Sequence, residues 1–132
     1  MKKIILDTNF LLIPIQFKVD ILSEIKRICA FNYELCIYES TMDELKSILE
    51  KGSGKDKNAA KFALKMVEAK DFKKLKSETS YVDSSILENA DENTIVATLD
   101  IALKKKLLDK GVSVIFLRQK KYLQYLQRKL YK

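Results

Sequence analysis

The chain has 132 residues, with 25 Lys and Arg against 18 Asp and Glu, 47% hydrophobic residues and no histidine. This length suits one domain, the apolar share excludes a disordered chain, and no run approaches the roughly 18 apolar residues of a membrane span. The lack of histidine excludes Ser-His-Asp and Cys-His catalysis and HExxH zinc sites, so hydrolytic chemistry must use carboxylates, lysines, tyrosines or a carboxylate-bound metal.

Short apolar runs and segments of helical spacing alternate along the chain. In chain order the predicted elements are a strand over residues 3–6, a helix over 17–30, a strand over 35–38, a helix from Ser40 to Gly52, a helix over 56–69, a helix capped by Asp83 or Ser84, a strand over 94–98, a helix over 101–110, a strand over 112–117 and a helical tail over 118–132. Residues 71–80 fit no element clearly. On the helix over 56–69, the spacing places Phe62, Met66 and Ala69 inward.

The alternation of strands and helices predicts an α/β fold with three layers, in which helices cover both faces of a mainly parallel central sheet. We expect residues 1–117 to form this domain and residues 118–132 to form a basic helical tail packed on it. In parallel α/β sheets, ligands bind at the carboxyl ends of the strands. Asp7 and Asp100 directly follow predicted strands, so both are expected at that edge.

Four carboxylates are candidates for chemistry, although each has a structural alternative. Asp7 and Asp100 can cap the turn or helix that follows them, Glu44 suits the first turn of a helix, and Asp83 is a good helix cap. In one cleft the four would repel each other unless a divalent cation neutralised them. Oxygen ligands favour Mg²⁺ or Mn²⁺, and such an ion makes water more acidic and offsets charge at a phosphoryl centre. A histidine base is then not required.

The acidic residues stand in four short motifs. These are Asp7-Thr8-Asn9 after the first strand, Glu44 in Thr41-Met42-Asp43-Glu44-Leu45, Asp83 in Val82-Asp83-Ser84-Ser85-Ile86, and Thr98-Leu99-Asp100. In this order they resemble the four acidic motifs of PIN-domain nucleases. Residues 111–123 also look like the ending of archaeal PIN proteins of the small-subunit rRNA-processing type. The resemblance covers residues 3 to 125.

The resemblance implies a divalent-metal-dependent endoribonuclease on a three-layer PIN-like fold. The positions that match the family's acidic metal site are Asp7, Glu44, Asp83 and Asp100, with Asn9 and Thr98 as supporting residues. Relatives of this subtype often have paired Asp where this chain has Asp83-Ser84, and Asp43 and Asp91 are nearby acids that could substitute. The implied partner is RNA, in particular structured rRNA, and a homodimer fits the family but is not decided by the sequence.

Residues 118–132 contain six basic residues and no acidic one, interleaved with tyrosines. Cations neutralise phosphates, and aromatic rings stack on unpaired bases. This pattern predicts nucleic-acid contact by Arg118, Lys120, Lys121, Tyr122, Arg128 and Lys129. The alternative is that the apolar side of the tail packs on the domain or on a partner subunit.

Cys29 and Cys36 predict neither a disulfide framework nor a zinc site, and they favour a reduced, cytoplasmic chain. The apolar start is interrupted at Asp7, so no secretory signal is predicted. The sequence leaves three functions open. The first is an rRNA-processing endoribonuclease, the second a toxin ribonuclease of the VapC type with the same chemistry, and the third a non-catalytic RNA-binding assembly factor that keeps the acids for structural reasons.

Overall fold

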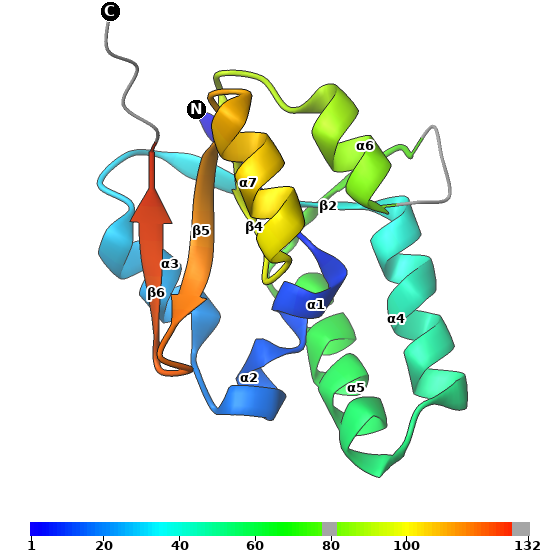
Figure 1. The fold of residues 1–132 in the computed structure, drawn as a ribbon. Helices are drawn as coiled ribbons and strands as arrows, with labels where there is room; N and C mark the ends of the chain where they lie inside the picture. Colours follow the sequence, from blue (N-terminus) through cyan, green and yellow to red (C-terminus); the bar gives the residue numbers. More distant parts are fainter. Residues whose placement is uncertain (78–81, 128–132) are drawn as a thin grey trace, which may run out of the picture.

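The computed structural model describes residues 1–77 and 82–127, including the side chains of all of these except residues 82–84. A central sheet lies between two layers of helices (Figure 1). Its strands are β1 (Lys2–Leu6), β2 (Tyr33–Tyr38), β3 (Lys73–Leu75), β4 (Thr94–Ala97), β5 (Ser113–Arg118) and β6 (Tyr122–Leu126). The helices are α1 (Thr8–Leu11), α2 (Ile13–Phe17), α3 (Ile21–Ile28), α4 (Glu39–Lys51), α5 (Gly54–Ala69), α6 (Val82–Asn89) and α7 (Ile101–Asp109).

The strand order in the sheet is β3-β2-β1-β4-β5-β6. All neighbouring pairs are parallel except β5 and β6, which are antiparallel. The predicted α/β fold with a mainly parallel sheet is therefore confirmed. Because β1 and β4 are parallel neighbours with Leu6 opposite Ala97, the residues that follow them leave the sheet side by side.

Alternate residues of each strand face opposite sides of the sheet, which creates two cores. On one side, Ile4 and Leu6 pack with apolar residues of α1, α2, α3, α4 and α5. On the other side, Ile5 packs with residues of α6 and α7, including Ile86 and Leu107. Burial on both faces explains why β1 and β4 read as continuous apolar or β-branched runs in the sequence.

The predicted helical tail over residues 118–132 is wrong wherever the structure describes it. β5 continues to Arg118, the chain reverses through Gln119 and Lys120, which both have positive φ, and Tyr122–Leu126 returns as β6. The physical reason is that the side chains of this segment alternate between the two faces of the sheet. Leu123 and Tyr125 pack on one core, and Leu126 packs on the other. The sheet therefore extends beyond residue 117, and residues 128–132 lie outside the described ranges.

Two helices also differ from the prediction. The expected helix over 17–30 begins only at Ile21, because Lys18 adopts a left-handed conformation and Asp20 caps α3 through a hydrogen bond from the Ser23 N–H at 3.1 Å. On α5, Met66 is buried as predicted, whereas Phe62 is 44% exposed and Ala69 is also exposed. The inner stripe of α5 consists of Ala59, Ala60, Ala63, Met66 and Val67. Alanines on this stripe allow close approach of the neighbouring helices.

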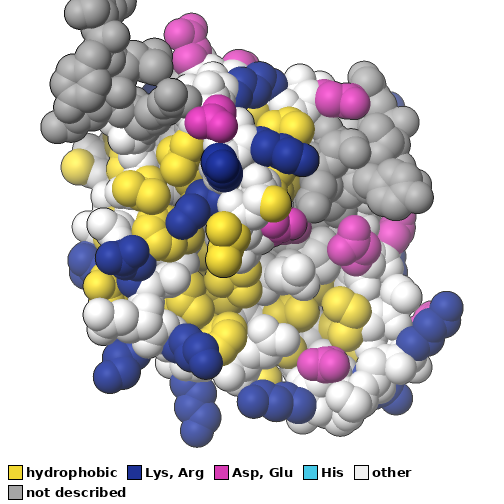
Figure 2. Space-filling view, in the orientation of Figure 1, with side chains coloured by type: hydrophobic (Ala, Val, Ile, Leu, Met, Phe, Trp, Pro, Cys, Tyr) yellow, Lys and Arg dark blue, Asp and Glu magenta, His cyan; other side chains and the backbone are white. Residues whose placement is uncertain are grey.

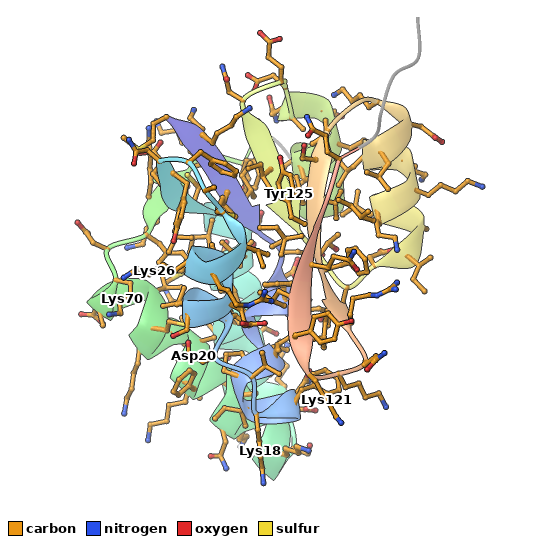
Figure 3. All side chains as sticks on the ribbon, turned by 90° about the vertical axis from the view of Figure 1, so that its left-hand side faces the viewer. Lys18, Asp20, Lys26, Lys70, Lys121 and Tyr125 are labelled. Atoms are coloured by element: carbon orange, nitrogen blue, oxygen red, sulfur yellow. The ribbon has the colours of Figure 1, made fainter. Side chains whose placement is uncertain are left out.

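Helix α3 lies beside the outer side of β6 (Figure 3), and two of its side chains bind the backbone of that strand. The Leu123 N–H donates to Glu24 Oε1 at 3.0 Å, and Arg27 Nη2 donates to the Leu123 carbonyl at 3.2 Å. Arg27 Nε and Glu24 Oε2 are 2.7 Å apart, which joins the two side chains. We call these three residues the Glu24–Arg27 clamp. It satisfies backbone groups at the end of the sheet that would otherwise be open to another strand.

Candidate active site

Asp7 stands at the carboxyl end of β1 and is only 4% exposed. Its N–H donates to the Ala97 carbonyl of the neighbouring strand at 2.9 Å, which fixes the backbone. Its Oδ1 accepts a hydrogen bond from the Thr8 N–H at 2.7 Å, and its Oδ2 accepts one from the Thr98 hydroxyl at 2.9 Å. Asp7 is thus the N-cap of the short helix α1, as the structural alternative anticipated, and is also bonded to the end of β4.

Thr98 links the two strand ends. Its side chain is buried, and its N–H donates to the Ile115 carbonyl of β5 at 3.1 Å. Its Oγ1 accepts a hydrogen bond from the Asp100 N–H at 3.1 Å while donating to Asp7. Asp100 in turn caps α7 by accepting from the Leu103 N–H at 3.0 Å, and it remains partly exposed. The fold therefore brings Asp7, Thr98 and Asp100 into one hydrogen-bonded unit.

Glu44 and Asn9 lie on helices beside this unit. Glu44 is exposed on α4, one turn after Thr41, whose buried hydroxyl is 3.4 Å from the Thr8 hydroxyl. Residues three apart share a helix face, so this contact places the Glu44 position on the side of α4 that faces α1. Asn9 is exposed in the first turn of α1.

Asp83 is the second residue of α6, and its side chain lies outside the described part of the structure. The helix is joined to β2 by the Tyr38 hydroxyl, which donates to the Ser85 carbonyl at 3.2 Å. The Ser85 hydroxyl is buried, and it has no hydrogen-bond partner among the described residues. Neither Tyr38 nor Ser85 was singled out from the sequence, because nothing local marks an interaction between residues 47 positions apart.

The donor chemistry of the site is that of oxygen ligands. Among the described side chains, no group of three or more Asp, Glu, Cys or His residues is close enough to hold a metal ion. The described part supplies two carboxylates joined through Thr98, with Glu44 on the neighbouring helix. Both cysteines are buried, and burial raises the pKa of Cys29 and that of Cys36, the latter to about 11, so neither is a reactive thiolate at neutral pH.

Four of the predicted nucleic-acid contacts reach the same edge of the sheet. Arg118 ends β5, Lys120 and Lys121 form the turn, and Tyr122 begins β6, and all four are exposed. Because β5 is parallel to β4, its end lies on the same side as Asp100. Figure 2 shows basic side chains gathered at the lower left of that view, where Figure 1 places the tip of this hairpin. Arg128 and Lys129 lie outside the described residues.

The protein is an α/β protein with carboxylates at the ends of neighbouring parallel strands. The site contains no histidine and no reactive thiolate, so carboxylates are its characteristic groups. The chain belongs to the PIN-like domain family, whose model, described as a PIN like domain, matches residues 4–120. In the described part of the chain, no helix is both long and apolar enough to cross a bilayer.

Two curated relatives and two solved structures are similar to this chain. It is 35% identical over 126 residues to Ribonuclease VapC4 of Methanocaldococcus jannaschii, covering 94% of this chain and 96% of that protein. It is 32% identical over 119 residues to Ribonuclease VapC9 of Archaeoglobus fulgidus, covering 89% and 84%. The PIN domain endonuclease Utp24 shares the fold, with a TM-score of 0.76, 22% identity and coverage of 93% and 90%. A domain of a functionally unknown Methanocaldococcus jannaschii protein has a TM-score of 0.57 at 19% identity, with coverage of 89% and 92%.

Proposed function

We propose that the protein is a divalent-metal-dependent endoribonuclease that hydrolyses RNA phosphodiester bonds. The observation that carries the proposal is the Asp7–Thr98–Asp100 unit at the carboxyl ends of two adjacent parallel strands. This is the edge at which α/β sheets bind ligands. Membership of the PIN-like domain family and the ribonuclease names of two relatives support the same assignment.

The residues that would hold Mg²⁺ or Mn²⁺ are Asp7, Glu44, Asp83 and Asp100, and all of them offer the oxygen donors that these ions prefer. When bound, the ion supplies a more acidic water and charge neutralisation at the phosphoryl group. Asn9 and Thr98 support the set. The buried hydroxyl of Ser85, two residues after Asp83, is a further polar group on α6 that a water molecule can satisfy.

Thr98 has a defined task in this proposal. A hydroxyl has one proton, and that of Thr98 goes to Asp7 Oδ2, while its lone pair accepts from the Asp100 N–H. The donated hydrogen bond fixes the orientation of the Asp7 carboxylate. The accepted bond fixes the backbone of Asp100. Thr98 is therefore a positioning residue for both acids.

The test is cleavage of a structured small-subunit rRNA fragment with Mg²⁺ or Mn²⁺, compared with EDTA and with Asp7→Asn. We expect metal-dependent cutting and a loss of at least about 100-fold in the variant, as for removal of one transition-state contact. Tight, salt-sensitive RNA binding without cutting in either metal would contradict the proposal and would favour the non-catalytic assembly factor.

The substrate that we propose first is rRNA, because a basic hairpin adjoins the acidic edge and fits a large, structured RNA. A toxin ribonuclease of the VapC type is the second candidate, and the names of two relatives favour it. Mapping the cut separates them. Cleavage of a specific rRNA position without growth arrest supports rRNA processing, whereas tRNA cleavage with growth arrest, relieved by a small neighbouring protein, supports a toxin.

A further inference from the structure

A cavity of about 420 Å³ opens beside Asp100, between the start of α7 and the end of β5. Thr98 and Asp100 line it on the side of the acidic unit, and Lys104, Phe116, Arg118 and Gln119 line it on the other side. A cavity of this size lies near the lower end of the roughly 300–1,000 Å³ of small-ligand sites. It is large enough for a single nucleotide and too small for a double helix.

Two cations of this cavity are held by the same aromatic ring. Lys104 Nζ lies 4.3 Å from the centroid of Phe116, and Arg118 Cζ lies 5.6 Å from it. The ring itself is only 8% exposed, so it forms a fixed floor. A ring attracts a cation without cancelling its charge. Among the described residues, the ion pairs are those of Arg27 with Glu24 and Lys73 with Glu34, so the charges of Lys104 and Arg118 are available to an anion.

The turn after Arg118 adds an independent observation. The Lys121 N–H donates to the Arg118 carbonyl at 3.0 Å, and Gln119 and Lys120 have φ values of 52° and 55°. Two consecutive left-handed residues define a hairpin turn that normally uses Asn-Gly, because side chains disfavour positive φ. This turn instead carries long polar and basic side chains beside the cavity. Strained backbone of this kind is typical of functional segments.

We propose that the cavity binds one nucleotide of an unpaired RNA strand, next to the acidic unit, with Lys104 and Arg118 contacting its phosphate. Gln119 lies at the cavity wall, and Lys120 and Lys121 contact the phosphates that continue past the turn. The inference rests on the proposed ribonuclease function, because it names the part of the substrate that this same site holds. It requires the strand to be unpaired where it enters the cavity.

The test is RNA binding in EDTA, where no metal-dependent cleavage occurs, measured by the anisotropy of a labelled ten-nucleotide single strand between 50 and 250 mM salt. We expect Lys104→Gln and Arg118→Gln each to weaken RNA binding about five- to tenfold. Each should also reduce the slope of log Kd against log salt concentration by the amount expected for the loss of about one phosphate contact. Lys104→Arg and Arg118→Lys, which keep the charge, should retain binding. Lys106→Gln removes the same charge from an exposed position of the same helix and should leave the Kd within about twofold.

Two results would overturn the inference: unchanged binding in both Gln variants while they melt at the wild-type temperature, or equal affinity for a duplex of the same sequence. Failure of the proposed function looks different. If the Gln variants lose binding but wild-type protein does not cut RNA with either metal, the nucleotide site stands and the nuclease does not. If they bind and cut like wild type while Asp7→Asn does not cut, the nuclease stands and the site is overturned.

Discussion

Two regions of the molecule hold carboxylates with backbone N–H groups, and they differ in the side chain that completes the contact. In the Glu24–Arg27 clamp, Glu24 accepts from the Leu123 N–H and faces a full positive charge 2.7 Å away. In the acidic unit, Asp7 accepts from the Thr8 N–H and the Thr98 hydroxyl, and Asp100 accepts from the Leu103 N–H. The clamp joins its carboxylate to a guanidinium group, whereas the acidic unit joins two carboxylates through a buried threonine hydroxyl and its hydrogen bonds.

The comparison teaches that a helix-capping hydrogen bond does not by itself decide what an acid is for. Asp20 caps α3 and Asp100 caps α7 by the same contact to the third residue of the helix, at 3.1 and 3.0 Å. Asp20 lies at an exposed helix start. Both acids line cavities, but Asp100 is also joined through the buried Thr98 hydroxyl to a second acid. The surroundings make Asp100 the candidate for chemistry.

The largest expected effect is the difference in RNA cleavage between Asp100→Asn and Asp20→Asn, which change two matched N-cap residues. Asn is as good an N-cap as Asp, so Asp100→Asn and Asp20→Asn should both fold. We expect Asp100→Asn to lower RNA cleavage by at least about 100-fold, because a carboxylate of the proposed metal site is lost. Asp20→Asn should cut like wild type. The measurement is the rate of RNA cleavage by both variants at saturating Mn²⁺. Equal activity of the two variants would show that Asp100 is not part of the metal site.

Replacing Thr98 tests the link inside the acidic unit. Thr98→Val keeps the shape but leaves the Asp100 N–H without its acceptor and Asp7 without one donor, so we expect a loss of about 1–3 kcal/mol in unfolding free energy. We also expect kcat to fall about tenfold with little change in KM, since the acids lose orientation rather than substrate contacts. Thr98→Ser keeps the hydroxyl and should restore most of both. A variant that is unstable yet fully active would make Thr98 a structural residue only.

A substitution in the Glu24–Arg27 clamp should lower stability without lowering RNA cleavage. Glu24→Gln keeps an acceptor for the Leu123 N–H but loses the charged contact with Arg27, and we expect only a small loss of about 0.5 kcal/mol because solvent screens the exposed Arg27 side chain. RNA cleavage should not change. Urea unfolding and hydrogen exchange at the Leu123 amide measure the effect, and a loss of activity at unchanged stability would show that the two regions are coupled.

The smallest effect concerns acid pH. The hydrogen bond from Arg27 lowers the pKa of Glu24 below its ordinary value of 4.5. A carboxyl with a lowered folded-state pKa contributes stability above its unfolded pKa and loses that contribution as the pH falls through the folded value. We therefore expect unfolding free energy to decline below about pH 5, with a shallower decline in Glu24→Gln. If unfolding free energy fell equally with pH in wild type and in Glu24→Gln, the decline would come from other carboxyls, such as Asp20 and Asp91, whose pKa values are also lowered.

Much of the acidic edge could be predicted because its signals are local. A buried parallel strand gives a continuous apolar run, so the sequence predicts strands over residues 3–6 and 94–98 and places Asp7 and Asp100 after them. The prediction of a helical tail is wrong because Tyr-Leu-Gln-Tyr-Leu fits a period of two as well as a helical spacing. The turn before it uses Gln119 and Lys120 rather than glycine, which hid the hairpin.

The remaining features arise only from tertiary structure. Lys104 and Phe116 come together because α7 packs beside β5, and the Thr98 hydroxyl reaches Asp7 across 91 residues. The sequence pattern groups Phe62 with Met66 on α5, yet Phe62 is exposed while Met66 packs inward beside the alanines. Local periodicity cannot choose between two adjacent stripes when small residues favour the closer packing.

The coverage of β6 has a consequence for how the protein can associate with itself. At one end of the sheet the Glu24–Arg27 clamp occupies both backbone groups of Leu123, and at the other end β3 spans only three residues, of which Lys73 and Lys74 are exposed. Short, charged or covered edges resist strand-to-strand addition. A strand of a second copy could therefore pair with Leu123 of β6 only after the clamp had opened. Both edges of the sheet thus carry features that oppose the addition of a strand from a second copy.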